Sequence, residues 1–285
     1  MVFLFPSTIQ PVTRNPRRSV GSAFAPGTVR WAVWVAALFL SLRATVAAAE
    51  APFAHGETLE FGVQWGGIPV GRASLRVNPE SYLGREAFRI VSHADSNDFL
   101  SLIFPVQDRV ESIIDAAQLT PFQLQLRQRH GRRSSDRMIV FDRDAGTAAV
   151  TGKGKTAVYD VPAGVQDVLS SLYYVRTLPA LAPGTSVFVN VFESRKNWIT
   201  EIQILKTERI IVPAGSFDTV KVKAVVRYEG LLMTKGDAYF WLTNDARRIP
   251  VQLEGEVAIG SVRAMLQSVE GPPMLQAAHE PKLNR

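Results

Sequence analysis

The densest group of side chains that could bind an anion lies in the segment RQRHGRR, from Arg127 to Arg133. Arginine forms paired hydrogen bonds with phosphate and carboxylate groups, and histidine adds a further donor. The binding candidates in this segment are Arg127, Arg129, His130, Arg132 and Arg133. Strand-like runs on both sides predict a basic hairpin turn here. The alternative interpretation is a solvated turn whose charges prevent association between sheet edges.

A second glycine-rich segment, TGKGKT from Thr151 to Thr156, invites comparison with a phosphate-binding loop. Ala149 stands where that motif requires its first glycine. The residues that follow, AVYDV, alternate like a strand, whereas the motif requires a helix. The segment therefore predicts the tip of a hairpin.

Metal-binding and catalytic motifs are missing from the sequence. There is no cysteine, which excludes thiol catalysis, zinc-thiolate sites and iron–sulfur clusters. The four histidines, His55, His93, His130 and His279, form no HExxH or similar spacing, and no G-x-S-x-G segment occurs. We therefore expect no metal, no cofactor and no enzymatic activity. A Ser-His-Asp triad assembled from distant strands stays open.

The segment from Val165 to Leu178 has apolar residues three and four positions apart, which predicts an amphipathic helix. Asp167 and Arg176 lie near its two ends, and Glu208 begins a later strand. We expect these three residues to form a buried ion network that docks the helix on a sheet, since charges near a core are normally paired. Tyr173 and Tyr174 are adjacent and must point in different directions, so one packs inward while the other is a candidate for ligand contact.

The first 49 residues differ from the rest of the chain. They contain five arginines and neither Asp nor Glu, and they end in an uncharged run, WAVWVAALFLSL, followed by Ala47-Ala48-Ala49. These are the parts of a signal peptide cleaved near Ala49, which predicts a periplasmic or otherwise exported protein. The alternative is an uncleaved segment that anchors the protein in the inner membrane. If cleavage occurs, the membrane is contacted only through the leader, before its removal.

The leader also explains the net charge of +6. Without its five arginines the chain carries 27 basic and 26 acidic residues. This balance gives no support for nucleic-acid binding.

The rest of the chain alternates apolar and polar residues in short runs separated by Gly, Pro, Asn and Asp. One example is the segment TVKVKAVV from Thr219 to Val226. This pattern predicts antiparallel strands joined by tight turns. We expect an all-β fold in which about a dozen strands form a single curled antiparallel sheet, a barrel or half-barrel, covered by one amphipathic helix. The expected domains are a signal peptide at 1–49, a β domain at 50–270 and a disordered tail at 271–285.

Several segments together resemble the DUF3108 family of uncharacterised exported bacterial proteins. They are ETLEFGVQWGGIPVGRASLRV from Glu57, QDVLSSLYYVR from Gln166, IIVPAGSFDTVKV from Ile210 and FWLTNDARRIPV from Phe240. Val168 stands where a proline is expected after the helix aspartate. The resemblance implies an exported, β-rich protein and offers no activity to carry over.

Two non-enzymatic functions remain open. The first is the binding of an apolar or envelope-derived ligand, such as a lipid, in the curved sheet. The second is an assembly or interaction role in which the basic hairpin docks an anionic envelope polymer or a protein partner. An unrecognised hydrolase is the third and weakest hypothesis.

Overall fold

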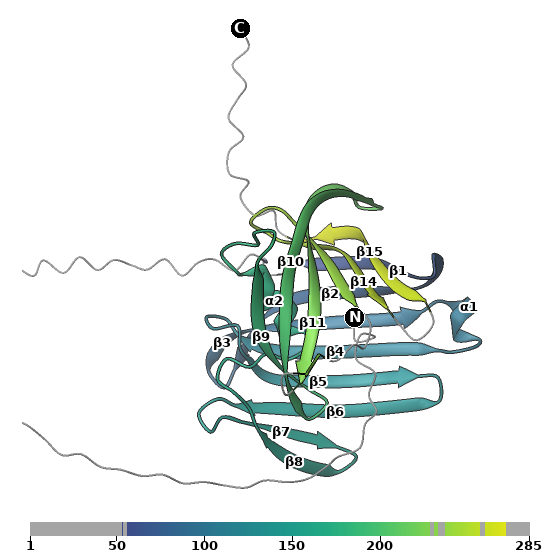
Figure 1. Ribbon diagram of the computed structural model, residues 1–285. Helices are drawn as coiled ribbons and strands as arrows, with labels where there is room; N and C mark the ends of the chain where they lie inside the picture. Colours follow the sequence, from purple (N-terminus) through teal and green to yellow (C-terminus); the bar gives the residue numbers. More distant parts are fainter. Residues whose placement is uncertain (1–52, 54–55, 229–230, 233–236, 257–259, 272–285) are drawn as a thin grey trace, which may run out of the picture. The chain divides into compact units, whose positions relative to one another are not determined.

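The computed structural model describes residue 53 and residues 56–228, 231–232, 237–256 and 260–271. The predicted leader, and the predicted tail from residue 272 onwards, lie outside these residues. The described part of the chain forms 15 strands and two short helices, α1 (Asp98–Ser101) and α2 (Ser170–Arg176) (Figure 1). The strands before α2 are β1 (Thr58–Trp65), β2 (Ile68–Tyr82), β3 (Arg85–Ser96), β4 (Val106–Asp115), β5 (Pro121–His130), β6 (Arg133–Asp142), β7 (Thr147–Gly152) and β8 (Lys155–Asp160). Those after it are β9 (Ser186–Glu193), β10 (Lys196–Val212), β11 (Gly215–Tyr228), β12 (Leu231–Leu232), β13 (Ala238–Thr243), β14 (Pro250–Glu256) and β15 (Ser261–Glu270).

All strands belong to one antiparallel sheet with the order β8-β7-β6-β5-β4-β3-β2-β1-β15-β14-β13-β11-β10-β9, and β12 pairs with β11. Two meanders, β1–β8 and β9–β15, therefore join where the first strand pairs with the last. The sheet is not closed by pairing of β8 with β9. Gln166, in the segment between β8 and α2, forms an isolated parallel bridge with Val191 of β9. The predicted curled antiparallel sheet is thus confirmed, in its open form.

Alternation along the strands separates an inner, apolar face from an outer, polar face. In β5 the buried residues Leu124 and Leu126 alternate with Gln123 and Gln125. The inner faces of both meanders meet in one large core cluster, which includes Phe88, Ile114, Phe192, Val251 and Leu266. Figure 1 shows β9, β10 and β11 crossing in front of β3–β5.

The inner face of the curled sheet is occupied by α2. Leu169, Leu172 and Tyr173 pack in the large cluster, and Val175 packs in a second cluster against β9–β11 and β13. The helix is shorter than the predicted segment 165–178, because the chain before it pairs with β9. The Gln166 N–H donates to the Asn190 carbonyl, and the Gln166 carbonyl accepts from Phe192 N–H.

The connection between β3 and β4 contains α1, a single helical turn. Asn97 caps it by accepting a hydrogen bond from the backbone N–H of Leu100 at 2.9 Å. Pro105 follows the turn and precedes β4.

Candidate functional site

The basic segment forms the predicted hairpin between β5 and β6. Its two-residue turn is Gly131-Arg132, and His130 pairs with Arg133. Gly131 has a φ of 61°, the left-handed conformation required at the first central position of a type II′ turn. A Cβ at this position would also lie 2.9 Å from the Phe104 ring. Both the backbone conformation and the lack of space therefore favour glycine here.

Arg127 and Arg129 lie on the outer face of β5. They alternate with the inward-facing Leu126 and are both exposed. Two residues along a strand are separated by roughly 7 Å, so both guanidinium groups can reach one anionic group. Arg129 forms no ion pair or side-chain hydrogen bond with another described residue. Arg127 Nε lies 3.8 Å from the carboxylate of Asp136.

The register of β4 against β5 places Arg109 directly opposite Arg127. Arg109 donates from Nε to Glu111 at 2.6 Å and from Nη1 to His93 Nε2 at 2.7 Å. Because arginine is always a donor, His93 Nε2 must be the acceptor in this contact. Like charges opposite each other in a sheet are destabilising, and the neighbouring carboxylates of Glu111 and Asp136 offset this in part.

These side chains line an open groove of about 380 Å³ over β3–β6. The lining residues are His93, Asp95, Gln107, Asp108, Arg109, Arg127, Gln128, Arg129, Ser134, Ser135 and Asp136. The groove therefore combines three arginines, a histidine and serine hydroxyls with three carboxylates, those of Asp95, Asp108 and Asp136. Such a set can bind a phosphate or carboxylate group through charge-assisted hydrogen bonds.

His130 takes a different position from the arginines beside it. It lies on the inner side of β5, where its Nε2 is 2.8 Å from Oδ1 of the buried Asp108. This hydrogen bond raises the pKa of His130 above its usual value, against the opposing effect of partial burial. The hairpin thus brings Arg127 and Arg129 together in the groove but directs His130 away from them.

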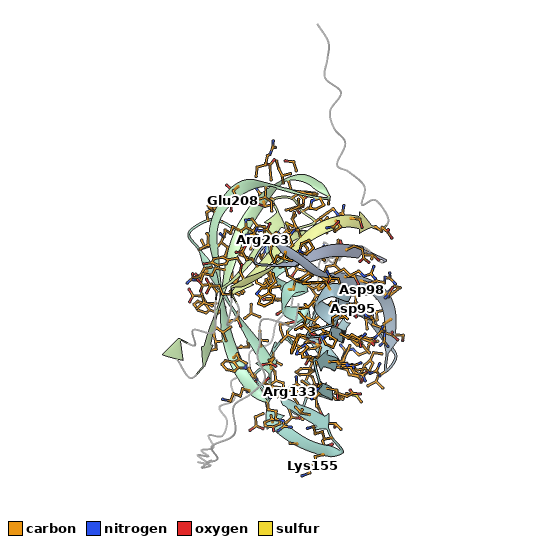
Figure 2. The ribbon with its side chains drawn as sticks, turned by 90° about the vertical axis from the view of Figure 1, so that its right-hand side faces the viewer. Asp95, Asp98, Arg133, Lys155, Glu208 and Arg263 are labelled. Carbon is orange, nitrogen blue, oxygen red and sulfur yellow. The ribbon has the colours of Figure 1, made fainter. Side chains whose placement is uncertain are left out.

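Arg132 and Arg133 are exposed at the turn itself, beyond the groove. In Figure 2, which looks onto this end of the sheet, Arg133 lies between Asp98 of α1 and Lys155 of the β7–β8 hairpin. The TGKGKT segment is the tip of that hairpin, as predicted, with Lys153 and Gly154 as its turn residues.

The two adjacent tyrosines separate as expected, but neither lines the groove. Tyr173 is completely buried, and its ring meets that of Phe53 edge to face at 5.0 Å. Burial raises the pKa of its hydroxyl. Tyr174 is half-buried against the second core cluster. Tyr173 is therefore part of the core, which corrects its selection as a ligand candidate.

Arg176 forms a fully buried ion pair with Glu57, the residue immediately before β1. Its Nη1 and Nη2 donate to the two carboxylate oxygens of Glu57 at 2.7 and 2.9 Å. The guanidinium also donates to the backbone carbonyl of Arg247 at 3.1 Å and lies over the rings of Phe53 and Tyr173. The helix is docked on the sheet by this pair.

Asp167 has separate partners at the other end of α2. Its carboxylate accepts hydrogen bonds from the N–H groups of Leu169 and Ser170 and from the hydroxyl of Ser112 in β4. It is completely buried, and this burial raises its pKa more strongly than the hydrogen bonds lower it. Asp167 therefore stabilises the start of the helix and ties it to β4.

Glu208 lies on the outer face, where its side chain cannot reach the helix. It accepts a hydrogen bond from Trp241 Nε1 at 2.9 Å and pairs with Lys206 at 2.9 Å; Lys206 is the main cause of its lowered pKa. The expected network of Asp167, Arg176 and Glu208 is thus corrected to three separate groups. The physical reason is the two-residue period of β10, which turns Glu208 away from the core.

Two important residues were missed by sequence reasoning. Glu57 lies 119 residues from Arg176, and nothing local marks it as the partner. Arg109 lies in a predicted strand and precedes the apolar Val110. The alternation of the strand therefore indicates that Arg109 points outward. Its position opposite Arg127 depends on strand register, which the sequence pattern does not give.

The described residues contain no group of three or more His, Cys, Asp or Glu side chains arranged to hold a metal ion. Neither helix in this part of the chain has the length and apolarity needed to cross a bilayer.

Comparison with known families identifies the class of protein. The model of the family "Protein of unknown function (DUF3108)" matches residues 60–267, which is most of the chain. The chain therefore belongs to the DUF3108 family, as its sequence motifs indicated. No curated protein matches the chain.

Solved structures with a similar fold include a β-barrel-like protein of the DUF1849 domain from Brucella abortus. It has a TM-score of 0.55 and 10% sequence identity, and the match covers 76% of this chain and 98% of that one. A candidate lipoprotein from Parabacteroides distasonis ATCC 8503 has a TM-score of 0.34 and 13% identity, with 78% and 99% covered. A candidate exported protein with a YmcC-like fold from Bacteroides fragilis NCTC 9343 has a TM-score of 0.30 and 13% identity, with 77% and 98% covered. Only the first likeness supports a shared fold.

Proposed function

We propose that this chain is a non-enzymatic, exported protein of the cell envelope that binds an anionic group of an envelope polymer. The binding site is the outer groove over β3–β6. Arg127 and Arg129 are the principal ligands, and Arg109 is the opposing cation. Export rests on the predicted leader, which lies outside the described residues.

The observation that carries this proposal is the placement of Arg109 opposite Arg127, with Arg129 two residues away on the same face. A like-charged pair across two strands costs stability, and an anion bound between the guanidinium groups would remove that cost. Planar guanidinium groups also match the geometry of phosphate and carboxylate oxygens better than ammonium groups do.

The packing of the inner face favours this outer site over a carrier cavity. Leu169, Leu172 and Tyr173 fill the inner face of the curled sheet and are 7% exposed or less. An apolar ligand bound there would have to displace α2, together with the buried pair between Arg176 and Glu57. The first of the two function hypotheses, an apolar ligand inside the sheet, is therefore not favoured.

The contacts of the two histidines in the described part of the chain, His93 and His130, argue against a hydrolase. His93 Nε2 already accepts a hydrogen bond from Arg109, so this nitrogen cannot also accept a proton from a nucleophile. His130 Nε2 is directed at the carboxylate of Asp108. These contacts support a binding site over a catalytic one.

The test is binding of two soluble polymers, inorganic polyphosphate and polygalacturonate, measured by isothermal titration calorimetry at low salt. We expect the wild-type chain to bind at least one of them. The double substitution Arg127→Ala and Arg129→Ala should weaken binding tenfold or more, because it removes two charge-assisted contacts. Raising the salt concentration should weaken wild-type binding as well.

The matched control is Arg209→Ala, which removes an exposed arginine paired with Asp218 in β10–β11, outside the groove. All variants carry the same leader arginines, so a difference between them reports the groove alone. Equal binding by the double variant and the Arg209→Ala control would contradict the proposal. So would failure of the wild-type chain to bind either polymer.

A further inference from the structure

The β3–β4 connection exposes four large apolar side chains within six residues. Phe99, Leu102, Ile103 and Phe104 are 63%, 86%, 75% and 48% exposed. Single exposed apolar residues are ordinary on protein surfaces, whereas a cluster of this kind usually marks an interaction site. Figure 1 places α1, which begins this connection, at the far end of β3 and β4. The apolar side chains therefore sit on a projecting turn.

The β1–β2 turn lies beside this connection and adds to its apolar surface. Asn97, which caps α1, donates from its side chain to the Pro69 carbonyl at 2.8 Å and from its backbone to the Val70 carbonyl at 2.7 Å. Ile68 in the same turn is 60% exposed. The two turns are thus held together by two hydrogen bonds that Asn97 donates, and they present one apolar tip. We call Ile68, Phe99, Leu102, Ile103 and Phe104 the apolar tip.

Cationic side chains lie on one side of the apolar tip. The Gly131 N–H donates to the Pro105 carbonyl at 2.7 Å, which joins the basic β5–β6 turn to the end of the tip. Figure 2 shows Arg133 and Lys155 following Asp98 along this end of the sheet. The exposed cations at this end are Arg129, Arg132, Arg133, Lys153 and Lys155, and the exposed acids are Asp95, Asp98 and Asp136. Positive charge therefore predominates next to the apolar tip.

We propose that this end of the sheet binds the surface of a bilayer that contains anionic phospholipids. Phe99, Leu102 and Ile103 would enter the boundary between headgroups and acyl chains, and Arg132 and Arg133 would contact the headgroups. Apolar side chains flanked by cations are the combination that binds such surfaces. This site departs from the sequence-based expectation that only the leader contacts the membrane. It does not depend on the proposed groove.

The shape and charge of the tip favour a bilayer over a second copy of the chain. A projecting turn can enter a fluid layer, whereas it would bury little area against a rigid, convex surface. A symmetric contact between two tips would also bring the arginines and lysines of both copies close together. That repulsion is absent when the opposite surface carries phosphate groups.

The first test uses the absence of cysteine from the chain, because a single introduced cysteine can then be labelled selectively. An environment-sensitive fluorophore such as NBD is attached at Leu102→Cys or, as the control, at Ile211→Cys. Ile211 is 81% exposed, similar to Leu102, but it lies in β10 next to the β10–β11 turn, outside the apolar tip. With phosphatidylglycerol vesicles, we expect a blue shift and a several-fold gain in intensity at position 102 and no change at position 211.

The second test is vesicle flotation of the unlabelled full-length chain. The double substitution Leu102→Asp and Ile103→Asp should lower binding to phosphatidylglycerol vesicles at least tenfold relative to Ile211→Asp, with unchanged circular dichroism spectra. Because both variants retain the leader, their difference reports the tip. Equal flotation of the two variants would overturn the proposal. So would a fluorophore response at position 102 that is equal with pure phosphatidylcholine, or that occurs at high protein concentration without vesicles and therefore reports self-association.

Discussion

Two arginine–carboxylate contacts on opposite faces of the sheet illustrate two uses of the same residue types. On the inner face, Arg176 and Glu57 are 0% and 1% exposed and form two hydrogen bonds of 2.7 and 2.9 Å. On the outer face, Arg127 and Asp136 are 54% and 69% exposed and lie 3.8 Å apart. The buried pair has well-formed hydrogen bonds that orient the helix, whereas the outer arginine is held loosely and can exchange its partner for a ligand.

The largest predicted effect is that of Arg176→Ala. The substitution leaves the Glu57 carboxylate buried without its main partner, which costs about 3–5 kcal/mol in proteins. For a chain of this size, the melting temperature should fall by about 10 °C. Differential scanning calorimetry of the wild type and the variant measures this change in melting temperature. A melting temperature within about 1 °C of the wild type would remove the structural role of the pair.

The matched control replaces both charges, with Glu57→Leu and Arg176→Met. Apolar side chains of similar length leave no uncompensated charge, so the double variant should be more stable than Arg176→Ala alone. If the double variant is the less stable of the two, the pair contributes more through its other contacts, including the Arg247 carbonyl, than through charge compensation.

A smaller, pH-dependent effect is predicted for His130. Asp108 raises the pKa of His130 in the folded protein, so the protonated imidazole stabilises the fold below about pH 6.5. This stabilisation is lost as the pH rises through the folded-state pKa. The imidazole is about one-third exposed, which limits the contribution to about 0.5 kcal/mol.

Urea unfolding of the wild type and of His130→Gln between pH 5.5 and 8.5 measures this contribution. Glutamine can still donate a hydrogen bond to Asp108 but does not titrate in this range. The stability difference between the two proteins should therefore decrease with increasing pH. A difference that stays constant across the range would exclude the His130–Asp108 pair as its source.

The smallest predicted effect on stability is that of Arg127→Ala with Arg129→Ala. Substitutions of exposed side chains without buried partners change the free energy of unfolding by about 0.5 kcal/mol or less. Removal of the charge opposite Arg109 could even stabilise the sheet. Thermal unfolding should thus leave this variant close to the wild type even where polymer binding is lost. A loss above about 1 kcal/mol would make the outer arginines structural, like Arg176.

The sequence predicts the local structure of this chain well. Alternation in segments such as FQLQLRQR, from Phe122 to Arg129, and turn residues such as His130-Gly131-Arg132 follow from short-range physical preferences of the backbone. The basic hairpin and the TGKGKT hairpin are confirmed for that reason. The helix was predicted too long because its first residues make backbone hydrogen bonds to β9, and no local pattern reveals this competition.

The candidate site could be predicted only in part. The two-residue period of a strand indicates which face each groove arginine occupies. The same period places Glu208 on the outer face, but this follows only once the strand register of β10 is known. The contact of Arg176 with Glu57 and the position of Arg109 opposite Arg127 depend on pairings between distant segments. Single-sequence patterns do not contain that information.

The pairing of the first strand with the last has a consequence for how the protein acquires its structure. Thr58 lies opposite Glu270, so β1 receives its second neighbour only when the end of the sheet is available. Contacts this distant along the chain make folding slow, because the entropy of a long loop is lost before the contact forms. Until then, β1 presents an unpaired edge that other chains can pair with. A chain interrupted during synthesis before β15 would therefore expose the edge of β1 and be prone to aggregation.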